Sequence, residues 1–139
     1  MKGHESKVHD AELVELHGIA TEVGSLVVCQ QSSVMDWDPI RTYFLYDVPN
    51  EASRGGHAHK ELQQMIVAVA GSFEVELNDG SNQRTVLMRS PQMGLRLPPG
   101  LWRELKHFSG GAICLVLASH KYDEADYIRD WGEFLKFKR

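Results

Sequence analysis

His57-Ala58-His59, with Gln64 and Gly71 behind it, and Pro98-Pro99-Gly100-Leu101-Trp102-Arg103 are the two motifs that decide the fold of this chain. The spacing is that of a two-part metal site in a β-barrel. There, glutamate and glycine follow a histidine pair, and a third histidine follows a Pro-x-Gly turn. Here Gln64 stands in place of the glutamate and Arg103 in place of the third histidine. A neutral amide binds metal weakly and arginine is a permanent cation, so we expect a pocket without a metal.

The bulk composition indicates one globular domain. The chain has 139 residues, 42% of them hydrophobic, and a net charge of −4, which argues against a nucleic-acid partner. No apolar run reaches the roughly 20 residues of a membrane helix, so no membrane partner is expected. The polar segment 1–10 lacks the apolar core of a signal peptide and is predicted to be a flexible leader before a single domain at 11–139. Cys29 and Cys114 are predicted to be free thiols in a reducing cytoplasm.

Short apolar runs separated by turn residues predict an all-β sandwich or barrel. The strands are expected at 13–17, 25–31, 41–48, 56–59, 63–70, 73–77, 83–88, 94–97, 102–108 and 112–119. The tail at 123–137 opens with acidic residues, ends with basic ones and repeats apolar residues at helical spacing. It predicts one or two short C-terminal helices on the outside of the barrel.

Strand alternation places the polar residues of interest. Residues i and i+2 of a strand point to the same face, so Arg41 and Tyr43 share one face, and His57 and His59 share another. A barrel strand has only an inner and an outer face. Polar side chains directed inward therefore require a lined cavity instead of a packed core.

The two motifs resemble the cupin pattern, and longer stretches resemble the sugar nucleotide 3,4-ketoisomerases, which are cupins related to dTDP-4-dehydrorhamnose 3,5-epimerases. The resemblance spans roughly residues 12 to 137. Its motifs are at 41–43 (RTY), 54–60 (RGGHAHK), 98–104 (PPGLWRE), 117–119 (LAS) and 122–129 (YDEADYIR). One departure is Arg96, where an aromatic or apolar residue is expected in relatives.

This resemblance implies a cupin jelly roll and a homodimer that exchanges N-terminal strands, here residues 12–31. It also implies an isomerase that needs no metal. The implied reaction converts dTDP-4-keto-6-deoxy-D-glucose to a dTDP-3-keto-6-deoxyhexose, in the biosynthesis of a deoxyamino sugar for lipopolysaccharide or another surface glycan.

Moving a carbonyl from C4 to C3 of a hexose requires a base for the C3 proton and passes through an enediol. The redox state is unchanged, so no cofactor is expected, and the chain has no glycine-rich dinucleotide fingerprint. Histidine has the appropriate pKa for the base. His57 is the first choice, as in the RGxH stretch of the related epimerases. His59 orients it, acts on the other carbon or stabilises the enediolate.

The remaining candidates contact substrate. Tyr43 is either the acid that serves the sugar or a packed strand tyrosine. Guanidinium groups bind phosphate oxygens through paired hydrogen bonds. Sugar hydroxyls and the nucleotide base form hydrogen bonds with neutral or acidic side chains. The substrate-binding candidates are Arg41, Arg54 and Arg103 for the diphosphate and pocket, with Gln64 and Glu104 for the sugar or base.

Three other functions stay open from the residues alone. In the first, the histidines are ligands of a metal-dependent cupin enzyme. In the second, the same proton chemistry serves a sugar nucleotide epimerase. In the third, the pocket binds a sugar without catalysis.

Overall fold

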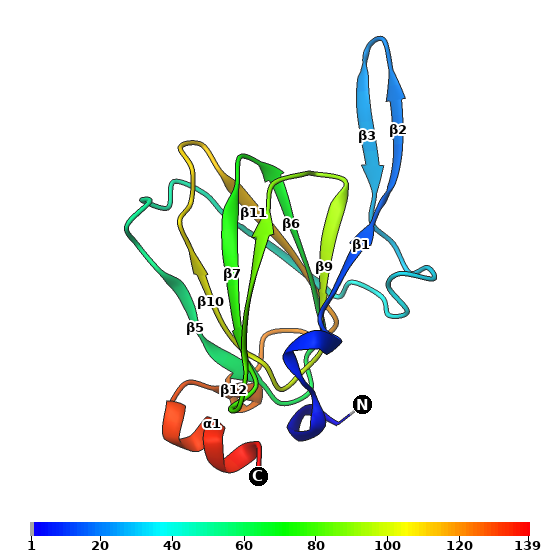
Figure 1. Ribbon diagram of the computed structural model, residues 1–139. Helices are drawn as coiled ribbons and strands as arrows, with labels where there is room; N and C mark the ends of the chain where they lie inside the picture. Colours follow the sequence, from blue (N-terminus) through cyan, green and yellow to red (C-terminus); the bar gives the residue numbers. More distant parts are fainter. Residues whose placement is uncertain (1) are drawn as a thin grey trace.

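Two five-stranded antiparallel sheets form the body of the protein, of which the computed structural model describes residues 2–139 (Figure 1). The first sheet has the order β1 (Glu12–Glu15), β9 (Met93–Leu97), β6 (Gln64–Ala70), β11 (Ile113–Ala118) and β4 (Arg41–Leu45). The second has the order β12 (Tyr127–Ile128), β5 (Arg54–His59), β10 (Trp102–Lys106), β7 (Phe73–Asn78) and β8 (Gln83–Met88). The predicted all-β fold is confirmed, as two separate sheets and not as a closed barrel.

Period-two alternation builds the core between these sheets. In β7, Phe73, Val75 and Leu77 are fully buried, whereas Glu74 and Glu76 between them are half-buried. Successive side chains of a strand point to opposite faces, so the apolar set meets the equivalent residues of the facing sheet. The stacked rings of Phe73 and Phe108, with centroids 5.1 Å apart, close one end of this core.

Strand β6 is apolar on both faces, because a second layer covers its outer side. Ile66 points into the core between the sheets, and Met65 and Val67 point the other way. The outward pair packs against Leu16 and Met35 from the N-terminal part of the chain. The segment between β3 and β4 therefore shields the back of the first sheet.

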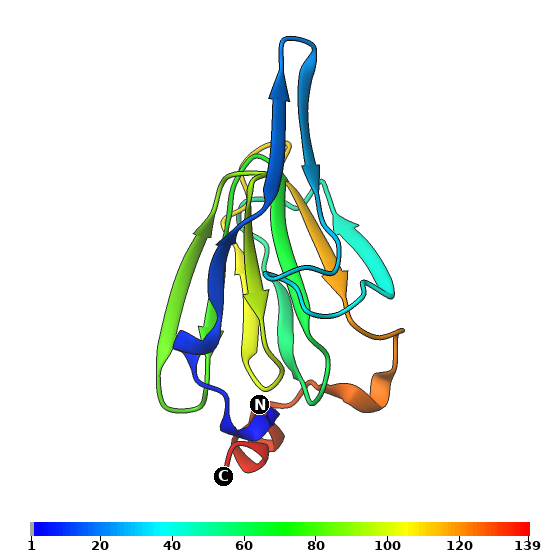
Figure 2. The same cartoon turned by 90° about the vertical axis from the view of Figure 1, so that its right-hand side faces the viewer.

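A separate hairpin projects from the body (Figure 2). It consists of β2 (His17–Thr21) and β3 (Gly24–Val28), which pair only with each other among the described residues. Its apolar side chains are open: Ile19 is 47%, Leu26 59% and Val23 98% exposed. The sequence predicted β3 in part and missed β2, because Gly18 and Ala20 weaken the strand signal there.

The C-terminal region contains one α-helix, α1 (Trp131–Phe137), which begins where the Asp130 side chain accepts a hydrogen bond from the Glu133 N–H. The predicted helix is confirmed there, but the tail before it is different. Residues 124–126 form a 3₁₀ turn and Tyr127–Ile128 form β12, which pairs with β5. No helix within residues 2–139 is long and apolar enough to cross a membrane.

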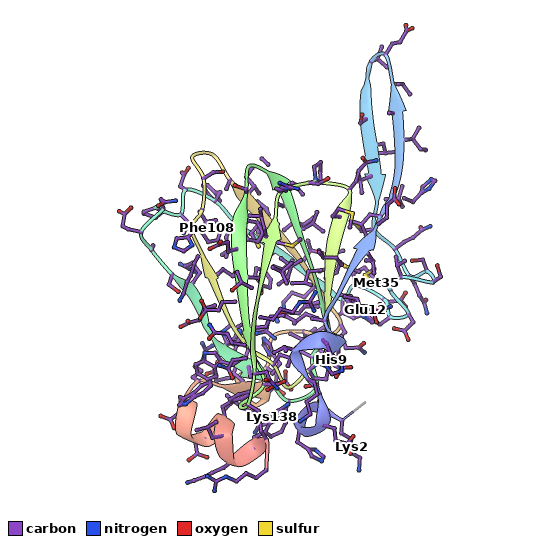
Figure 3. All side chains as sticks on the ribbon, in the orientation of Figure 1. Lys2, His9, Glu12, Met35, Phe108 and Lys138 are labelled. Atoms are coloured by element: carbon purple, nitrogen blue, oxygen red, sulfur yellow. The ribbon has the colours of Figure 1, made fainter. Side chains whose placement is uncertain are left out.

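The N-terminal segment, predicted to be a flexible leader, packs against the C-terminus in its described part (Figure 3); Met1 lies outside the described residues. Two 3₁₀ turns, Gly3–Glu5 and Val8–Asp10, flank Ser6, which is fully buried and donates to the Pro99 carbonyl at 2.8 Å. Gly100 has φ +85°, and a Cβ there would lie 1.7 Å from the Gly3 carbonyl oxygen. The Pro-x-Gly turn is thus held between both ends of the chain.

Lys138 completes this contact. Its ammonium group donates to the Gly3 and Ser6 carbonyls at 3.0 and 2.7 Å, to Ser6 Oγ at 3.1 Å and to the Gly100 carbonyl at 2.9 Å. One charged donor therefore bridges the N-terminus, the C-terminus and the turn that precedes Arg103.

Lys138→Met is expected to lower the free energy of unfolding by about 1–3 kcal/mol, because part-buried carbonyl acceptors lose a charged donor. Urea denaturation followed by tryptophan fluorescence measures this change. Lys136→Met is the matched control: the Lys136 side chain is 71% exposed, and its Nζ lies 3.6 Å from a Glu133 carboxylate oxygen. It is expected to change stability by less than about 0.5 kcal/mol. Equal effects of the two substitutions would contradict a bracing role for Lys138.

Candidate active site

A cavity of about 600 Å³ lies between the two sheets, on the side where β4 faces β5 and β12. Six of the sequence-predicted site residues line it: Arg41, Tyr43, Arg54, His57, Gln64 and Arg103. Apolar side chains from four strands complete the wall, namely Leu45, Ile66, Leu105 and Val116. The alternation that placed Arg41 and Tyr43 on one face is confirmed, because both are half-buried while Thr42 and Phe44 are exposed.

A bulge in β5 brings Arg54 and His57 to the same wall. Residues three apart in a regular strand point to opposite faces, but the register between β10 and β5 shifts here, so that Arg103 pairs with His57 and Glu104 with Gly55. Gly55 and Gly56 adopt φ +94° and +70°. A Cβ at Gly55 would lie 2.9 Å from the Arg103 carbonyl oxygen, so this crossing requires glycine.

The two histidines form a direct pair, of which His57 lines the cavity and His59 lies behind it. Their Nε2 atoms are 3.2 Å apart and their rings are almost perpendicular, at 86°. His59 is completely buried and His57 is half-buried. Burial, followed by the Arg103 cation, lowers the pKa of His57 to about 3 and also lowers the pKa of His59. Both rings are therefore neutral at neutral pH, the state in which imidazole accepts a proton.

Arg103 stands at one metal-ligand position of the motif and is bonded to Gln64, which stands at another. Its side chain is almost fully buried and donates through Nη1 to Gln64 Oε1, while Gln64 Nε2 donates to the Tyr43 hydroxyl at 3.1 Å. Burial lowers the pKa of Arg103 to about 10, which leaves it charged at neutral pH. The Gln64 amide oxygen, the atom with which this residue could bind a metal, is thus bonded to the Arg103 cation. Residues 2–139 contain no cluster of three or more histidine, cysteine or acidic side chains arranged for a metal. These residues do not fit a divalent ion.

Two cavity residues were not predicted as site residues, although both lie in the 122–129 motif. Tyr127 lies with its ring centroid 4.9 Å from His57 and 4.3 Å from His59, and Arg129 stacks over Tyr127 with Cζ 4.2 Å from the ring. Both line the cavity. The apolar periodicity of the tail assigned Tyr127 to a helix, and only the pairing of β12 with β5 directs it to the histidines.

Two other residues lie outside the cavity wall. Glu104 lies on the face of β10 opposite Arg103, where it is 34% exposed and its carboxylate is 3.5 Å from Lys106 Nζ. Arg96, the departure from the expected pattern, forms an ion pair with Glu12 at 2.8 Å and donates to the Val34 carbonyl. Its guanidinium group therefore lies outside the cavity, where it links β9 to β1 and to the segment between β3 and β4.

Two facing antiparallel sheets with a polar cavity between them define a cupin-type protein. The chain belongs to the FdtA family, described as WxcM-like, C-terminal, which matches residues 9–139. The resemblance seen in the sequence is confirmed, and with it the prediction that the chain is a sugar 3,4-ketoisomerase.

Relatives cover almost the whole chain. The TDP-4-oxo-6-deoxy-alpha-D-glucose-3,4-oxoisomerase of Aneurinibacillus thermoaerophilus is 36% identical over 126 residues, which is 91% of each chain. The crystal structure of a 3,4-ketoisomerase from Helicobacter canadensis has a TM-score of 0.89 and 38% identity, covering 93% of this chain and 97% of that one. A histidine-to-asparagine mutant of the 3,4-ketoisomerase QdtA from Thermoanaerobacterium thermosaccharolyticum, in complex with TDP-4-keto-6-deoxyglucose, has a TM-score of 0.90 and 30% identity, covering 94% of both chains.

Gln64→Glu combined with Arg103→His is expected to create a site that binds a divalent ion through four side chains. The double substitution removes the buried cation and supplies two anionic or imidazole ligands beside His57 and His59. Zinc titration calorimetry and the metal content of the purified variant measure the binding.

The two single substitutions are the controls. Arg103→His and Gln64→Glu each supply only one ligand and are expected to bind zinc far more weakly than the double variant. A wild-type protein that retains one tightly bound ion per chain would contradict the metal-free site.

Proposed function

We propose that the protein converts TDP-4-keto-6-deoxyglucose to the 3-keto isomer, with His57 as the base. The observation that carries this proposal is the neutral His57, which lines the cavity and is paired with the buried His59, while Gln64 and Arg103 hold the metal-ligand positions. The relatives from A. thermoaerophilus and T. thermosaccharolyticum, with this sugar in a name and in a bound complex, support the substrate. The product then serves the assembly of a deoxyamino sugar for a surface glycan.

The reaction is a pair of proton transfers. The C3 proton, acidified by the neighbouring ketone, passes to His57 while O4 takes up a proton, which gives the enediol. O3 then releases its proton and C4 receives one, so the carbonyl ends at C3 with no change in redox state. A neutral histidine is needed for the first step, and burial keeps His57 in that state.

Arg103 is assigned to the oxygen that develops negative charge. Its Nη2 is buried and has no protein hydrogen-bond partner among the described residues. An unmade hydrogen bond of a buried donor costs about 1–3 kcal/mol, which a substrate oxygen would recover. A fixed cation in a water-poor site stabilises an enediolate strongly, because it needs no reorganisation during the reaction.

Three further arginines are assigned to the diphosphate. Arg41, Arg54 and Arg129 line the cavity from β4, β5 and the segment after β12. Arg41 lies with Cζ 5.6 Å from the rings of both Tyr43 and Tyr122, and its buried Nε lacks a protein partner among residues 2–139. Guanidinium groups in this arrangement suit paired contacts with phosphate oxygens.

Two tyrosines are available for the proton on the sugar oxygens. Burial raises the pKa of Tyr43, which keeps its phenol protonated as a donor. Tyr127 contacts both histidines and reaches the cavity from the opposite sheet. Gln64 holds Tyr43 in place and is assigned, with it, to the sugar. Glu104 faces away from this cavity, so its assignment to substrate is not kept.

The protein is further proposed to act as a homodimer with exchanged N-terminal strands. The hairpin of β2 and β3 exposes Ile19, Val23 and Leu26, and the edge strand β4 exposes Phe44 to 59%. An open edge strand beside apolar side chains is a surface that another strand can cover. Docking of one subunit's hairpin on the partner's β4 edge would bury both sets.

The cytoplasm is the proposed location. Cys29 and Cys114 are both free, and Cys114 is completely buried. Unpaired thiols of this kind are typical of a reducing compartment.

His57→Asn is expected to lower turnover of TDP-4-keto-6-deoxyglucose by more than about 100-fold, because asparagine cannot act as the base. Proton NMR of the sugar follows formation of the 3-keto product, and TDP binding by calorimetry is expected to be retained. His9→Asn, whose ring is 80% exposed, is the control with wild-type activity. Wild-type protein that returns a C3 or C5 epimer, or that leaves the sugar unchanged, would overturn the proposal.

Light scattering of the wild-type protein is expected to give the mass of a dimer. A variant in which residues 17–28 are replaced by a short turn is expected to be monomeric, because it loses the exposed apolar hairpin. Circular dichroism of this variant checks that the two main sheets remain folded. A monomer mass for the wild type would contradict strand exchange.

A further inference from the structure

Asp126, which the sequence analysis did not single out, is held firmly beneath the histidine pair. Its Oδ2 lies 3.0 Å from His59 Nδ1, and its Oδ1 accepts a hydrogen bond from the Glu61 N–H at 2.8 Å. The backbone adds a third contact, because the Lys60 N–H donates to the Asp126 carbonyl at 2.9 Å. The carboxylate is therefore fixed in position, and its side chain is only 19% exposed.

This contact determines which nitrogen of each ring carries a proton. An ionised carboxylate only accepts hydrogen bonds, so His59 must donate to it from Nδ1–H. In the neutral ring, His59 Nε2 is then an acceptor. The facing Nε2 of His57, 3.2 Å away, must be the donor. His57 is left with its lone pair on Nδ1, a buried atom that makes no hydrogen bond to residues 2–139.

We propose that Asp126 is a positioning residue that acts through His59 to set the tautomer of His57. The inference rests on the proposed function and deepens it, because it names Nδ1 as the nitrogen of His57 that takes the C3 proton. His59, which is completely buried, orients its neighbour and does not touch substrate.

The same chain of contacts stabilises the protonated base. When Nδ1 of His57 takes the substrate proton, the ring becomes an imidazolium beside the Arg103 cation, which opposes this charge. Its Nε2–H stays bonded to His59, which stays bonded to the Asp126 carboxylate. The negative charge two contacts away offsets part of the repulsion. The arrangement matches the aspartate and histidine logic of nucleophilic triads, in which the aspartate holds the tautomer and is not itself protonated.

Asp126→Asn tests the proposal with almost no change in shape. The Glu61 N–H still needs an acceptor, so the carboxamide oxygen of the asparagine turns toward it. The NH₂ group then faces His59 Nδ1. His59 must then carry its proton on Nε2, against the Nε2–H of His57. His57 is forced to the Nδ1–H tautomer and loses the lone pair that accepts the proton.

The expected result is a fall in kcat of at least about 100-fold, with KM and TDP affinity within about twofold of wild type because the cavity wall is unchanged. Asp123→Asn is the matched control. Asp123 lies in the same turn and caps it by accepting from the Ala125 N–H, a role that asparagine also performs. It is expected to keep wild-type kcat. Wild-type kcat in Asp126→Asn, or an equal loss in both variants, would overturn the positioning role.

A second readout does not depend on activity. Heteronuclear NMR of the imidazole nitrogens in the wild-type protein, assigned with His57→Asn and His59→Asn, is expected to show Nδ1–H for His59 and Nε2–H for His57. Asp126→Asn is expected to reverse both. A His57 protonated on Nδ1 in the wild type would overturn the inference even with full activity. If the wild type fails to isomerise the sugar, the proposed function fails, while these spectra still decide the tautomers.

Discussion

A buried cation, Arg103, lies where the metal-binding motif has its third histidine, and the chemistry of the cavity depends on it. Arg103 lies almost fully buried on β10, bonded to Gln64 and through it linked to Tyr43. Its guanidinium group lies where the third histidine of the motif would point toward a metal. Burial, and after it the Arg103 charge, opposes protonation of His57 and His59, which therefore stay neutral. Histidine rings that coordinate no metal keep a lone pair that can accept a proton.

The position of that cation depends on contacts far from the cavity. Arg103 follows the Pro-x-Gly turn, and this turn is bonded on one side to the His59 carbonyl, from the Gly100 N–H at 2.7 Å. On the other side it meets Gly3 and Lys138, which come from the two ends of the chain. The termini thus support the strand that carries the arginine.

Both sheets contribute to the cavity, and they do so by different local means. Regular alternation in β4 directs Arg41 and Tyr43 inward, whereas β5 needs the Gly55 bulge to direct both Arg54 and His57 to the same side. The cavity of about 600 Å³ lies on the side of β4 and β12, and the apolar core fills the opposite side. A lined cavity and a packed core therefore coexist in one sandwich.

From the sequence alone we could predict the strands other than β2 and β12, the shared face of Arg41 and Tyr43, and the presence of Gln64 and Arg103 at two metal-ligand positions. These features follow from local periodicity and side-chain chemistry, which need no knowledge of distant contacts. Three placements emerged with the folded chain: Tyr127 and Asp126 lie against the histidines, Arg54 faces inward, and Glu104 faces away. The tail could form a helix or a strand by its own pattern, and pairing with β5, more than 60 residues away in the chain, selected the strand. Such pairing is set by the packing of the whole sheet and not by the residues of the tail.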